Sequence, residues 1–376
     1  MKVLIAVTHL LGAGHLTRAA ALARGFAGAG HRVILVSGGM PAAHIALDGL
    51  EVVQLPPVRS DGTDFTRLLT PDGPADADYL ARRGVAMEEA ARTLAPDVVI
   101  TELFPFGRRI LAAEFRALIA AARQANPAVR VLCSIRDILA PPSSQKKADR
   151  TAALLAELYD AVLVHSDPAI VPLSLSWPIT PEVEAKLRYT GFVVAGAETP
   201  APQARGREVL VSAGGGSVGR PVFEAAIAAA RLAPDLDWRL LVGGADAEQV
   251  CAALAQDAPA NLRVEPARPD FRTLLARAGA SVSLAGYNTA MDLILTGVPA
   301  VLVPFDAGSE TEQGLRAEGL AQLPGVTVLR AAEVTPAALV ASVRHVMADT
   351  ARPRGGFALD GVGESLRIVT QMGETS

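Results

Sequence analysis

The sequence has little cysteine and no excess of positive charge, and each shortage argues against a class of protein. Its two cysteines, Cys133 and Cys251, stand far apart in apolar stretches, with no C-x-x-C pair and no matching histidine cluster. This pattern argues against a zinc site and a disulfide framework, and it suits a reducing compartment. Lysine is scarce and the formal net charge is -4. The basic domain or stripe of most nucleic-acid-binding proteins is therefore missing, and we expect no nucleic-acid partner.

Long apolar runs are missing as well. No stretch reaches the roughly 18 uninterrupted apolar residues that a membrane-spanning helix needs. The first apolar run, Val3–Val7, is short and is soon followed by glycines, so it predicts a buried strand and not a signal peptide. We therefore expect a cytoplasmic protein without a transmembrane segment. Peripheral contact with the inner face of the cytoplasmic membrane stays open.

What the chain does have is length and apolar content, with 376 residues of which 50% are hydrophobic. This length suits two α/β domains of ordinary size. A stretch rich in Ala, Gly and Pro near the middle predicts a linker. The expected division is 1–195 for the first domain, 196–207 for the linker, 208–356 for the second domain and 357–376 for a helical tail that could pack back on the first domain.

Both halves open with the same pattern of apolar strand, glycine-rich turn and amphipathic helix. This repetition predicts two Rossmann-like domains, each a doubly wound parallel sheet covered by helices, with a ligand cleft between them. Predicted strands of the first half are 3–7, 32–36, 97–101, 130–135 and 161–164, and its predicted helices are 16–27, 79–94 and 110–123. Predicted strands of the second half are 208–212, 238–242, 262–264, 280–284 and 299–303, with a helix at 222–232.

The first glycine-rich turn contains Gly12, Gly14 and His15. It does not match a dinucleotide fingerprint, because Thr17 replaces the third glycine and no ribose-binding acid ends the second strand, so NAD is not expected. His15 falls in the first helical turn, at the carboxyl end of the first strand, where it could act as a general base. Capping the helix or contacting an anion are the alternatives for His15, and close helix–sheet packing is the alternative for the glycines.

The second turn runs Gly214-Gly215-Gly216-Ser217. Its backbone N–H groups and the helix N-terminus behind it suit a phosphate or diphosphate. The Gly-Lys-Ser/Thr ending of a Walker A loop is missing, which argues against an ATPase or kinase. A purely structural turn is the alternative, although consecutive glycines cost conformational entropy on folding.

The most informative segment is Ser283–Asp292, a strand that leads into a glycine turn and a helix with an acid one turn in. Gly286 permits close backbone approach, Thr289 can cap the helix or contact phosphate, and Asp292 can accept both hydroxyls of a ribose. The pair Glu312-Gln313 lies beyond a later strand and can bind sugar hydroxyls. The alternatives are an acid that offsets the helix dipole and a solvated glutamate.

Several of these motifs together resemble the MurG-like glycosyltransferases of glycosyltransferase family 28 type. They are the turns G-A-G-H and G-G-G-S, and the run G-Y-N-T-A-M-D followed by G-V-P-A-V-L-V-P-F and E-Q. The likeness spans both halves and is clearest over 281–313. Segments 101–109 and 134–137 are more typical of an uncharacterised bacterial subgroup of predicted glycosyltransferases. The resemblance implies the GT-B fold, with the acceptor side in 1–195 and the nucleotide-sugar side in 208–356.

The resemblance also implies roles in binding a nucleoside-diphosphate sugar, with UDP as the expected nucleotide. Phosphate would be bound by Gly214, Gly215, Gly216 and Ser217, and the diphosphate side would be lined by Gly286, Tyr287, Asn288 and Thr289. The ribose would be bound by Asp292, and the uracil would lie near Arg268. The sugar would be bound by Glu312 and Gln313. Asp292 stands where the family usually has Glu, and Glu312 where it has Gln. The choice of hexose or N-acetylhexosamine therefore stays open.

The implied chemistry is metal-independent, inverting transfer without a cofactor, in which His15 takes the proton of the acceptor hydroxyl. Glu102 and Asp137 each follow a predicted strand and are the alternative bases or acceptor-sugar ligands. The acceptor is unknown. In the resembling family it is often lipid-linked, and the apolar and basic segment 104–111 suits either lipid contact or core packing.

Three other functions stay open. A UDP-sugar hydrolase on the same fold would use water in place of the acceptor, and the start G-A-G-H-L-T-R resembles such hydrolases as well. A UDP-sugar 2-epimerase would use the same fold and convert one donor into its epimer. A non-catalytic nucleotide-sugar-binding protein would bind UDP and consume no donor.

Overall fold

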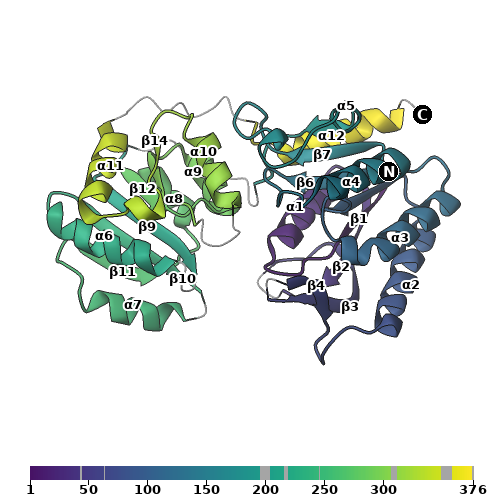
Figure 1. Cartoon of the computed structure of the whole chain (residues 1–376), viewed down its shortest axis with the longest axis horizontal. Helices are drawn as coiled ribbons and strands as arrows, with labels where there is room; N and C mark the ends of the chain where they lie inside the picture. The colour runs from purple at the N-terminus through teal and green to yellow at the C-terminus, as the bar shows by residue number, and fades with distance from the viewer. Residues whose placement is uncertain are drawn as a thin grey trace. The chain divides into compact units, whose positions relative to one another are not determined.

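The computed structural model describes residues 1–42, 45–62, 64–194, 204–215, 219–244, 246–305, 311–348 and 358–374. The chain divides into two compact units, Met1–Ala195 with Ala358–Ser376, and Gly196–Phe357 (Figure 1). They are called unit 1 and unit 2 below, and each is described by itself. Among the helices of the described ranges, none combines the length and the apolar character needed to cross a membrane.

Unit 1 is built on an eight-stranded sheet in the order β4-β3-β2-β1-β5-β6-β7-β8. Every neighbouring pair is parallel except β3 and β4. The central strands are almost entirely buried, as expected for a parallel sheet with helices on both faces. The strands are β1 (Lys2–Val7), β2 (Arg32–Gly39), β3 (Glu51–Asp61), β4 (Asp64–Leu69), β5 (Val98–Glu102), β6 (Arg130–Arg136), β7 (Ala161–His165) and β8 (Leu187–Tyr189).

Two apolar layers cover this sheet, one on each face. One contains buried residues of α2 and α3, and the other contains buried residues of α1 and α12. The helices of unit 1 are α1 (Gly14–Gly28), α2 (Ala77–Leu94), α3 (Ala112–Ala125), α4 (Gln145–Leu158), α5 (Pro181–Glu184) and α12 (Gly361–Glu374). The predicted strands and helices of the first half are all present, with bounds that differ by a few residues.

The last helix, α12, packs against the first, α1 (Figure 1). A Cβ added at Gly25 of α1 would lie 2.1 Å from a methyl carbon of Val362, so this close approach requires glycine. Two backbone hydrogen bonds fasten the start of the segment, from N of Phe192 to O of Ala358 at 2.7 Å and from N of Gly361 to O of Phe192 at 3.1 Å. The C-terminal residues are thus part of the unit 1 core.

The hairpin β3–β4 was not predicted from the sequence. Its strands lack a clean alternation of apolar and polar residues, and β3 contains Pro56 and Pro57. Proline removes a ladder hydrogen bond, which makes a strand hard to recognise. The hairpin extends the sheet at the edge furthest from β5 and does not form the site described below.

A buried arginine fixes the carboxyl end of β1. Arg83 of α2 is fully buried and forms a two-pronged ion pair with Glu114 of α3, at 3.1 and 3.0 Å. It also donates to O of Gly38 at 2.9 Å and contacts the hydroxyl of Thr8 at 3.5 Å. Because one guanidinium joins two helices to two strand ends, the loop that follows β1 starts from a rigid position.

Unit 2 is built on a six-stranded, fully parallel sheet in the order β11-β10-β9-β12-β13-β14. One apolar core, containing Phe223 of α6 and Trp238 of β10, lies against it. The strands are β9 (Glu208–Gly215), β10 (Asp237–Gly243), β11 (Leu262–Pro266), β12 (Ala280–Ser283), β13 (Ala300–Leu302) and β14 (Val326–Val328). The helices are α6 (Arg220–Leu232), α7 (Ala247–Ala255), α8 (Phe271–Arg277), α9 (Tyr287–Thr296), α10 (Glu312–Leu320) and α11 (Pro336–Ala348).

Candidate functional site

Each unit has one point at which the order of its strands reverses. In unit 1 this point lies between β1 and β5, and in unit 2 it lies between β9 and β12. In open α/β sheets, ligands bind outside the carboxyl ends of the strands at such a switch point. Most of the predicted site residues fall at these two points, so each is described in turn.

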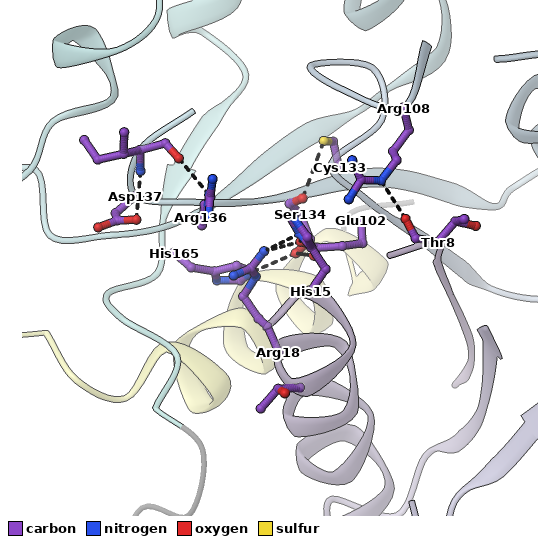
Figure 2. Close-up of polar contacts among 12 residues, drawn as sticks. Thr8, His15, Arg18, Glu102, Arg108, Cys133, Ser134, Arg136, Asp137 and His165 are labelled. Carbon is purple, nitrogen blue, oxygen red and sulfur yellow. Dashed lines mark hydrogen bonds and ion pairs between the residues drawn. The ribbon is translucent and has the colours of Figure 1, made fainter. Parts of the chain in front are cut away.

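At the switch point of unit 1, His15 meets Glu102 (Figure 2). His15 is the second residue of α1, and Glu102 is the last residue of β5. Nδ1 of His15 lies 2.8 Å from Oε1 of Glu102. The side chain of Glu102 is buried, whereas that of His15 keeps 14% exposure. Among the described residues, no partner is found for Nε2 of His15.

The charge of Glu102 fixes the position of the proton on His15. Burial by itself would raise the pKa of Glu102, but the charge of Arg18 and the hydrogen bond of His15 outweigh it and hold this pKa well below its usual range. An ionised carboxylate can only accept, so Nδ1 of His15 carries the proton and donates it. Burial lowers the pKa of His15 to about 4. The ring is therefore neutral near pH 7, with its lone pair on Nε2.

Arg18, one helical turn after His15, supplies the counter-charge to Glu102. Its guanidinium forms a buried ion pair with Oε1 of Glu102. Nη2 of Arg18 also lies 3.1 Å from Nδ1 of His15. Both nitrogens donate to the same carboxylate oxygen, which explains why they are close without either accepting from the other. Sequence reasoning missed Arg18, although the motif G-A-G-H-L-T-R contained it.

Two further polar residues behind Glu102 were also missed. Ser134 of β6 donates to Oε2 of Glu102 at 2.6 Å, and Nε2 of His165, the last residue of β7, lies 2.9 Å from the serine hydroxyl. Only the order of the strands brings these residues together. A polar residue near the end of each of three apolar strands was the one signal in the sequence that could have indicated them.

Asp137, the other predicted alternative base, follows β6 and is fully buried. Its Oδ1 accepts the backbone N–H of Ile138 at 2.8 Å. Figure 2 shows it apart from the pair His15–Glu102. By accepting this hydrogen bond from the adjacent backbone, the buried carboxylate stabilises the turn after β6. Asp137 is therefore a weaker candidate for the general base than His15.

The glycines in the loop before His15 are not required by close packing. Gly12 has φ +66, in the left-handed region that favours glycine, and a Cβ added at Gly12 or Gly14 would meet nothing within 4 Å. Arg108, in the loop after β5, donates from Nε to O of Thr8 at 2.6 Å. Burial lowers the pKa of Arg108 to about 10. The charged side chain of Arg108 therefore lies at the end of β1, the strand that leads into the glycine loop and His15.

In unit 2, the predicted diphosphate-binding residues stand at the switch point between β9 and β12. Gly214 and Gly215 are the last residues of β9, while Gly216 and Ser217 lie outside the described residues. Across the switch point, Gly286 is the N-cap residue of α9 and provides no side-chain cap. A Cβ added at Gly286 would meet nothing within 4 Å, so the space beside it is open. The first turn of α9 carries no acid. Backbone N–H groups at a helix N-terminus without an acid nearby suit an anion.

The first turn of α9 presents three of the predicted donor-site residues. Asn288 is exposed, whereas Tyr287 and Thr289 are half-buried. The guanidinium of Arg316 lies over the ring of Tyr287, 5.6 Å from its centre. The ring is thus held from α10, and the two polar side chains that follow it lie at the start of the helix.

Asp292, the predicted ribose ligand, is paired in the structure. Its Oδ1 accepts from Nε of Arg272 in α8 at 2.6 Å, and its side chain keeps 14% exposure. Burial raises the pKa of Asp292, and the charge of Arg272 opposes this rise. Oδ2 has no partner among the described residues. Oδ2 is therefore available to a ligand, while a ribose hydroxyl at Oδ1 would share that oxygen with Arg272.

Glu312 and Gln313, the predicted sugar ligands, begin α10. Oε1 of Gln313 accepts two backbone N–H groups, those of Ala285 and Phe305, each at 3.1 Å. This joins the loop after β12 to the loop after β13 and turns the amide NH₂ of Gln313 away from both. Glu312 accepts from the buried Arg316 at 2.8 Å, so sugar hydroxyls would compete with that ion pair.

Arg268, predicted to lie near the uracil, follows β11. Its guanidinium pairs with Asp270 at 2.8 and 3.0 Å and is 42% exposed. β11 is the second strand from β9. At a strand spacing of ~4.8 Å, Arg268 starts roughly 10 Å from the switch point. The nucleobase of a bound nucleotide could therefore reach Arg268 only if the nucleotide were extended.

In the part of the chain that the structure describes, neither switch point gathers the ligands of a metal ion. Within the described ranges, no group of three or more His, Cys, Asp or Glu side chains is arranged to hold one.

Comparison with known families identifies the second half of the chain. Residues 210–354 match the family model described as "Glycosyltransferase family 28 C-terminal domain". This range begins in β9 and includes α9, Asp292 and Gln313. The chain has a MurG-like C-terminal domain of glycosyltransferase family 28. The predicted family resemblance is thereby confirmed, and the matched residues lie in unit 2.

Curated relatives match over part of their length. A UDP-N-acetylglucosamine--N-acetylmuramyl-(pentapeptide) pyrophosphoryl-undecaprenol N-acetylglucosamine transferase of Rhodospirillum centenum is 34% identical over 151 residues, which is 38% of this chain and 39% of that protein. The protein of the same name from Xanthomonas axonopodis pv. citri is 33% identical over 164 residues, or 42% of this chain and 38% of that protein. The chain thus matches about two fifths of the length of these relatives.

Solved structures match over the whole chain and confirm the predicted GT-B fold. MurG of Acinetobacter baumannii covers 99% of both chains with a TM-score of 0.62 at 17% identity. The calicheamicin glycosyltransferase CalG4 covers 99% of this chain and 94% of its own, with a TM-score of 0.61 at 21% identity. The glycosyltransferase VinC in complex with dTDP covers 100% of both, with a TM-score of 0.60 at 18% identity. At these identities the likeness concerns the fold alone.

Proposed function

We propose that this chain is a glycosyltransferase that moves a hexose or N-acetylhexosamine from a nucleoside-diphosphate sugar to an acceptor hydroxyl. The observation that carries the proposal is the neutral His15 held through Nδ1 by Glu102, at the strand end where a ligand is expected. The family match of residues 210–354 supports a nucleotide-sugar donor in unit 2. These two observations support a general base in unit 1 and a donor-binding site in unit 2.

The proposed reaction is a single displacement. The acceptor oxygen attacks the anomeric carbon and forms the new glycosidic bond, while the bond from that carbon to the donor phosphate breaks. The acceptor proton goes to Nε2 of His15, and the electron pair of the broken bond leaves with the nucleoside diphosphate. Attack from the opposite face inverts the anomeric configuration. Glu102 stabilises the imidazolium that forms, because it is ionised and 2.8 Å away.

The leaving diphosphate is assigned to the N-terminus of α9 and the end of β9. The first turn of α9 carries no acid, and backbone N–H groups at a helix N-terminus can meet the charge that develops on the phosphate. Donors of this kind are worth about 3 kcal/mol each in other enzymes. We propose that these groups take the place of a divalent cation, and transfer that persists in a strong chelator would support this.

The donor nucleotide is assigned as UDP by the names of the curated relatives, which specify UDP-N-acetylglucosamine. The alternative nucleotide is thymidine diphosphate, because VinC, a chain of the same fold, was solved in complex with it. The acceptor named for the curated relatives is linked to pyrophosphoryl-undecaprenol, and a lipid-linked acceptor is proposed here on that basis. Contact with the inner face of the cytoplasmic membrane would follow from such an acceptor.

The test is a screen of purified protein against UDP-, GDP- and TDP-sugars, first by thermal shift and then by release of nucleoside diphosphate with and without candidate acceptors. Stabilisation reports binding directly. Release that needs an acceptor supports transfer. Release without any acceptor would indicate a hydrolase, formation of an epimer would indicate a 2-epimerase, and binding with no turnover would indicate a non-catalytic nucleotide-sugar-binding protein. No stabilisation by any donor would contradict the proposal.

A further inference from the structure

Behind Glu102 lie three buried polar side chains to which the proposed function gives no role, those of Ser134, His165 and Thr190. Together with Glu102 they are called the buried chain below. Oγ of Ser134 donates to Oε2 of Glu102 at 2.6 Å and lies 2.9 Å from Nε2 of His165. Nδ1 of His165 lies 2.8 Å from Oγ1 of Thr190. None of the four side chains is more than 2% exposed.

The sheet places these residues side by side. Ser134 is the register partner of Glu102 across β5 and β6, and His165 ends β7, the next strand. Thr190 directly follows β8, and its N–H donates to O of Val164 in β7. The buried chain therefore crosses four neighbouring strands at their carboxyl ends. Figure 2 shows its first three members converging on the place where His15 and Arg18 also point.

The proton positions along the buried chain follow from the charge of Glu102. Because the carboxylate is ionised, Ser134 must donate to it, and the hydroxyl has no second proton to give. Nε2 of His165 must therefore carry a proton and donate it to Ser134. Burial lowers the pKa of His165 to about 3, so the ring is neutral and Nδ1 must accept from Thr190. Arg18 and Glu102 are the charged groups that act on this ring.

We propose that Ser134 and His165 are positioning residues of the base, which hold Oε2 of Glu102 so that Oε1 stays aimed at Nδ1 of His15. The inference rests on the proposed function in so far as it concerns turnover. A free carboxylate can rotate and exchange its two oxygens. Here Oε1 is held by His15 and Arg18 and Oε2 by Ser134. The fixed carboxylate keeps the proton of His15 on Nδ1, and so keeps Nε2 available to the acceptor.

The first test needs no substrate. ¹⁵N NMR of histidine-labelled protein at pH 7 distinguishes the two neutral tautomers, and a His165→Asn variant identifies the signal of His165. We expect His15 with its proton on Nδ1 and His165 with its proton on Nε2. In Ser134→Ala, His165 loses its acceptor and should move its proton to Nδ1, where Thr190 can accept it and donate in turn to O of Gly191, 2.8 Å away. A charged His165, or one that already carries its proton on Nδ1 in the unaltered protein, would overturn the proposal.

The second test is kinetic. Ser134→Ala should lower kcat about tenfold with little change in KM, the loss expected for one hydrogen bond to a charged group. Ser134→Thr, which keeps the hydroxyl, should recover most of this loss. Ser176→Ala is the matched control, because Ser176 is also buried in unit 1 and accepts the N–H of Leu139 at 3.0 Å, outside the buried chain. Its kcat should match that of the unaltered protein.

A double-mutant cycle separates positioning from mere support of the fold. If Ser134 acts through Glu102, then Ser134→Ala should change kcat less than twofold in a Glu102→Gln background. An equal, tenfold loss in both backgrounds would overturn the positioning role. If the protein turns over no donor at all, the proposed function fails while the NMR result still decides the proton order. If turnover is normal and Ser134→Ala behaves like Ser176→Ala, the positioning role fails alone.

Discussion

The two switch points of this molecule are built in opposite ways. In unit 1, the strand ends carry charged and polar side chains that are buried and bound to one another, with Arg18, Glu102, Ser134 and His165 in one network. In unit 2, the corresponding place offers backbone N–H groups at the start of α9 and the glycines that end β9. The first site is built from side chains that bind one another, and the second from backbone groups of the kind that bind anions.

This difference matches what each site is proposed to do. A base must be held in one tautomer and one direction before the acceptor arrives, and a buried ionic network provides that order at the cost of desolvating charges. A diphosphate brings its own charge, so its site needs only donors and open space. The comparison therefore predicts that unit 1 depends on single side chains for its stability, whereas unit 2 depends on them mainly for ligand affinity.

The largest expected effect on stability comes from Glu102→Ala, which leaves Arg18 buried without its counter-charge. Removing one partner of a buried pair typically costs about 3–5 kcal/mol, and unit 1 should lose that amount of unfolding free energy in denaturant titration. Glu157→Ala is the control, because it removes the exposed pair with Arg116 and should cost less than about 1 kcal/mol. Equal losses for the two variants would mean that the buried network is not a stability element.

Acidification should separate the two units. His15 and His165 have folded-state pKa values lowered from 6.5 to about 4 and about 3. A lowered pKa contributes stability that is full above pH 6.5 and is lost as the pH falls toward the folded value. From pH 7 to pH 5, unit 1 should lose on the order of 2 kcal/mol for each histidine.

Asp292 should act in the other direction. Its pKa is raised by burial, so its contribution to the stability of unit 2 is present below its unfolded value and is lost as the pH rises through the folded value. Calorimetry from pH 7 to pH 5 should therefore show the transition of unit 1 falling more steeply than that of unit 2. Parallel shifts of both transitions would contradict the comparison.

In unit 2, Asp292→Asn should weaken nucleotide binding with little loss of stability. The free Oδ2 is assigned to a ribose hydroxyl, and one hydrogen bond to a charged group is worth about 1.5–3 kcal/mol, which is roughly tenfold or more in Kd. Calorimetric titration with the nucleoside diphosphate measures it. Asp235→Asn, which alters an exposed carboxylate of unit 2 paired with Arg344, should leave Kd unchanged. An unchanged Kd for Asp292→Asn would remove this residue from the donor site.

The smallest effect is expected at Gln313. Gln313→Glu keeps an acceptor for the N–H groups of Ala285 and Phe305 but loses the amide donors, so it should weaken a nucleotide sugar several-fold and the nucleotide alone hardly at all. Gln313→Ala also removes the acceptor and should weaken both. The difference between the two ligands in one titration series is the measurement. Equal weakening of both ligands by Gln313→Glu would assign this side chain to loop structure only.

The strands and helices were predicted well from the sequence, whereas the hydrogen bonds and ion pairs between side chains were not. Strands such as β1, β5 and β7 were recognisable because each is a short, uninterrupted apolar run, and the glycines and His15 followed from their position after such a run. The pairing of His15 with Glu102 was not predicted, although both were named as candidates. Nor was the hydrogen bond that Oδ1 of Asp292 accepts from Arg272.

These omissions share a physical cause. Periodicity reports which face of an element is buried, but not which strand lies next to which. Ser134 lies within the apolar run of β6 and gave no signal of its own, and Glu102 acquires its partners only because β5 lies between β1 and β6. A buried charge network therefore becomes visible only once the order of the sheet is known.

The most direct test of the account is the variant His15→Ala, measured for both transfer and nucleotide affinity. His15 lies in unit 1 and is assigned the acceptor proton, while the nucleotide is assigned to unit 2. We predict that kcat falls by about 10²–10⁴, the contribution of a positioned general base, while Kd for the nucleoside diphosphate changes less than twofold. Undiminished transfer, or a loss of affinity as large as the loss of rate, would contradict the division between a base in unit 1 and a donor site in unit 2.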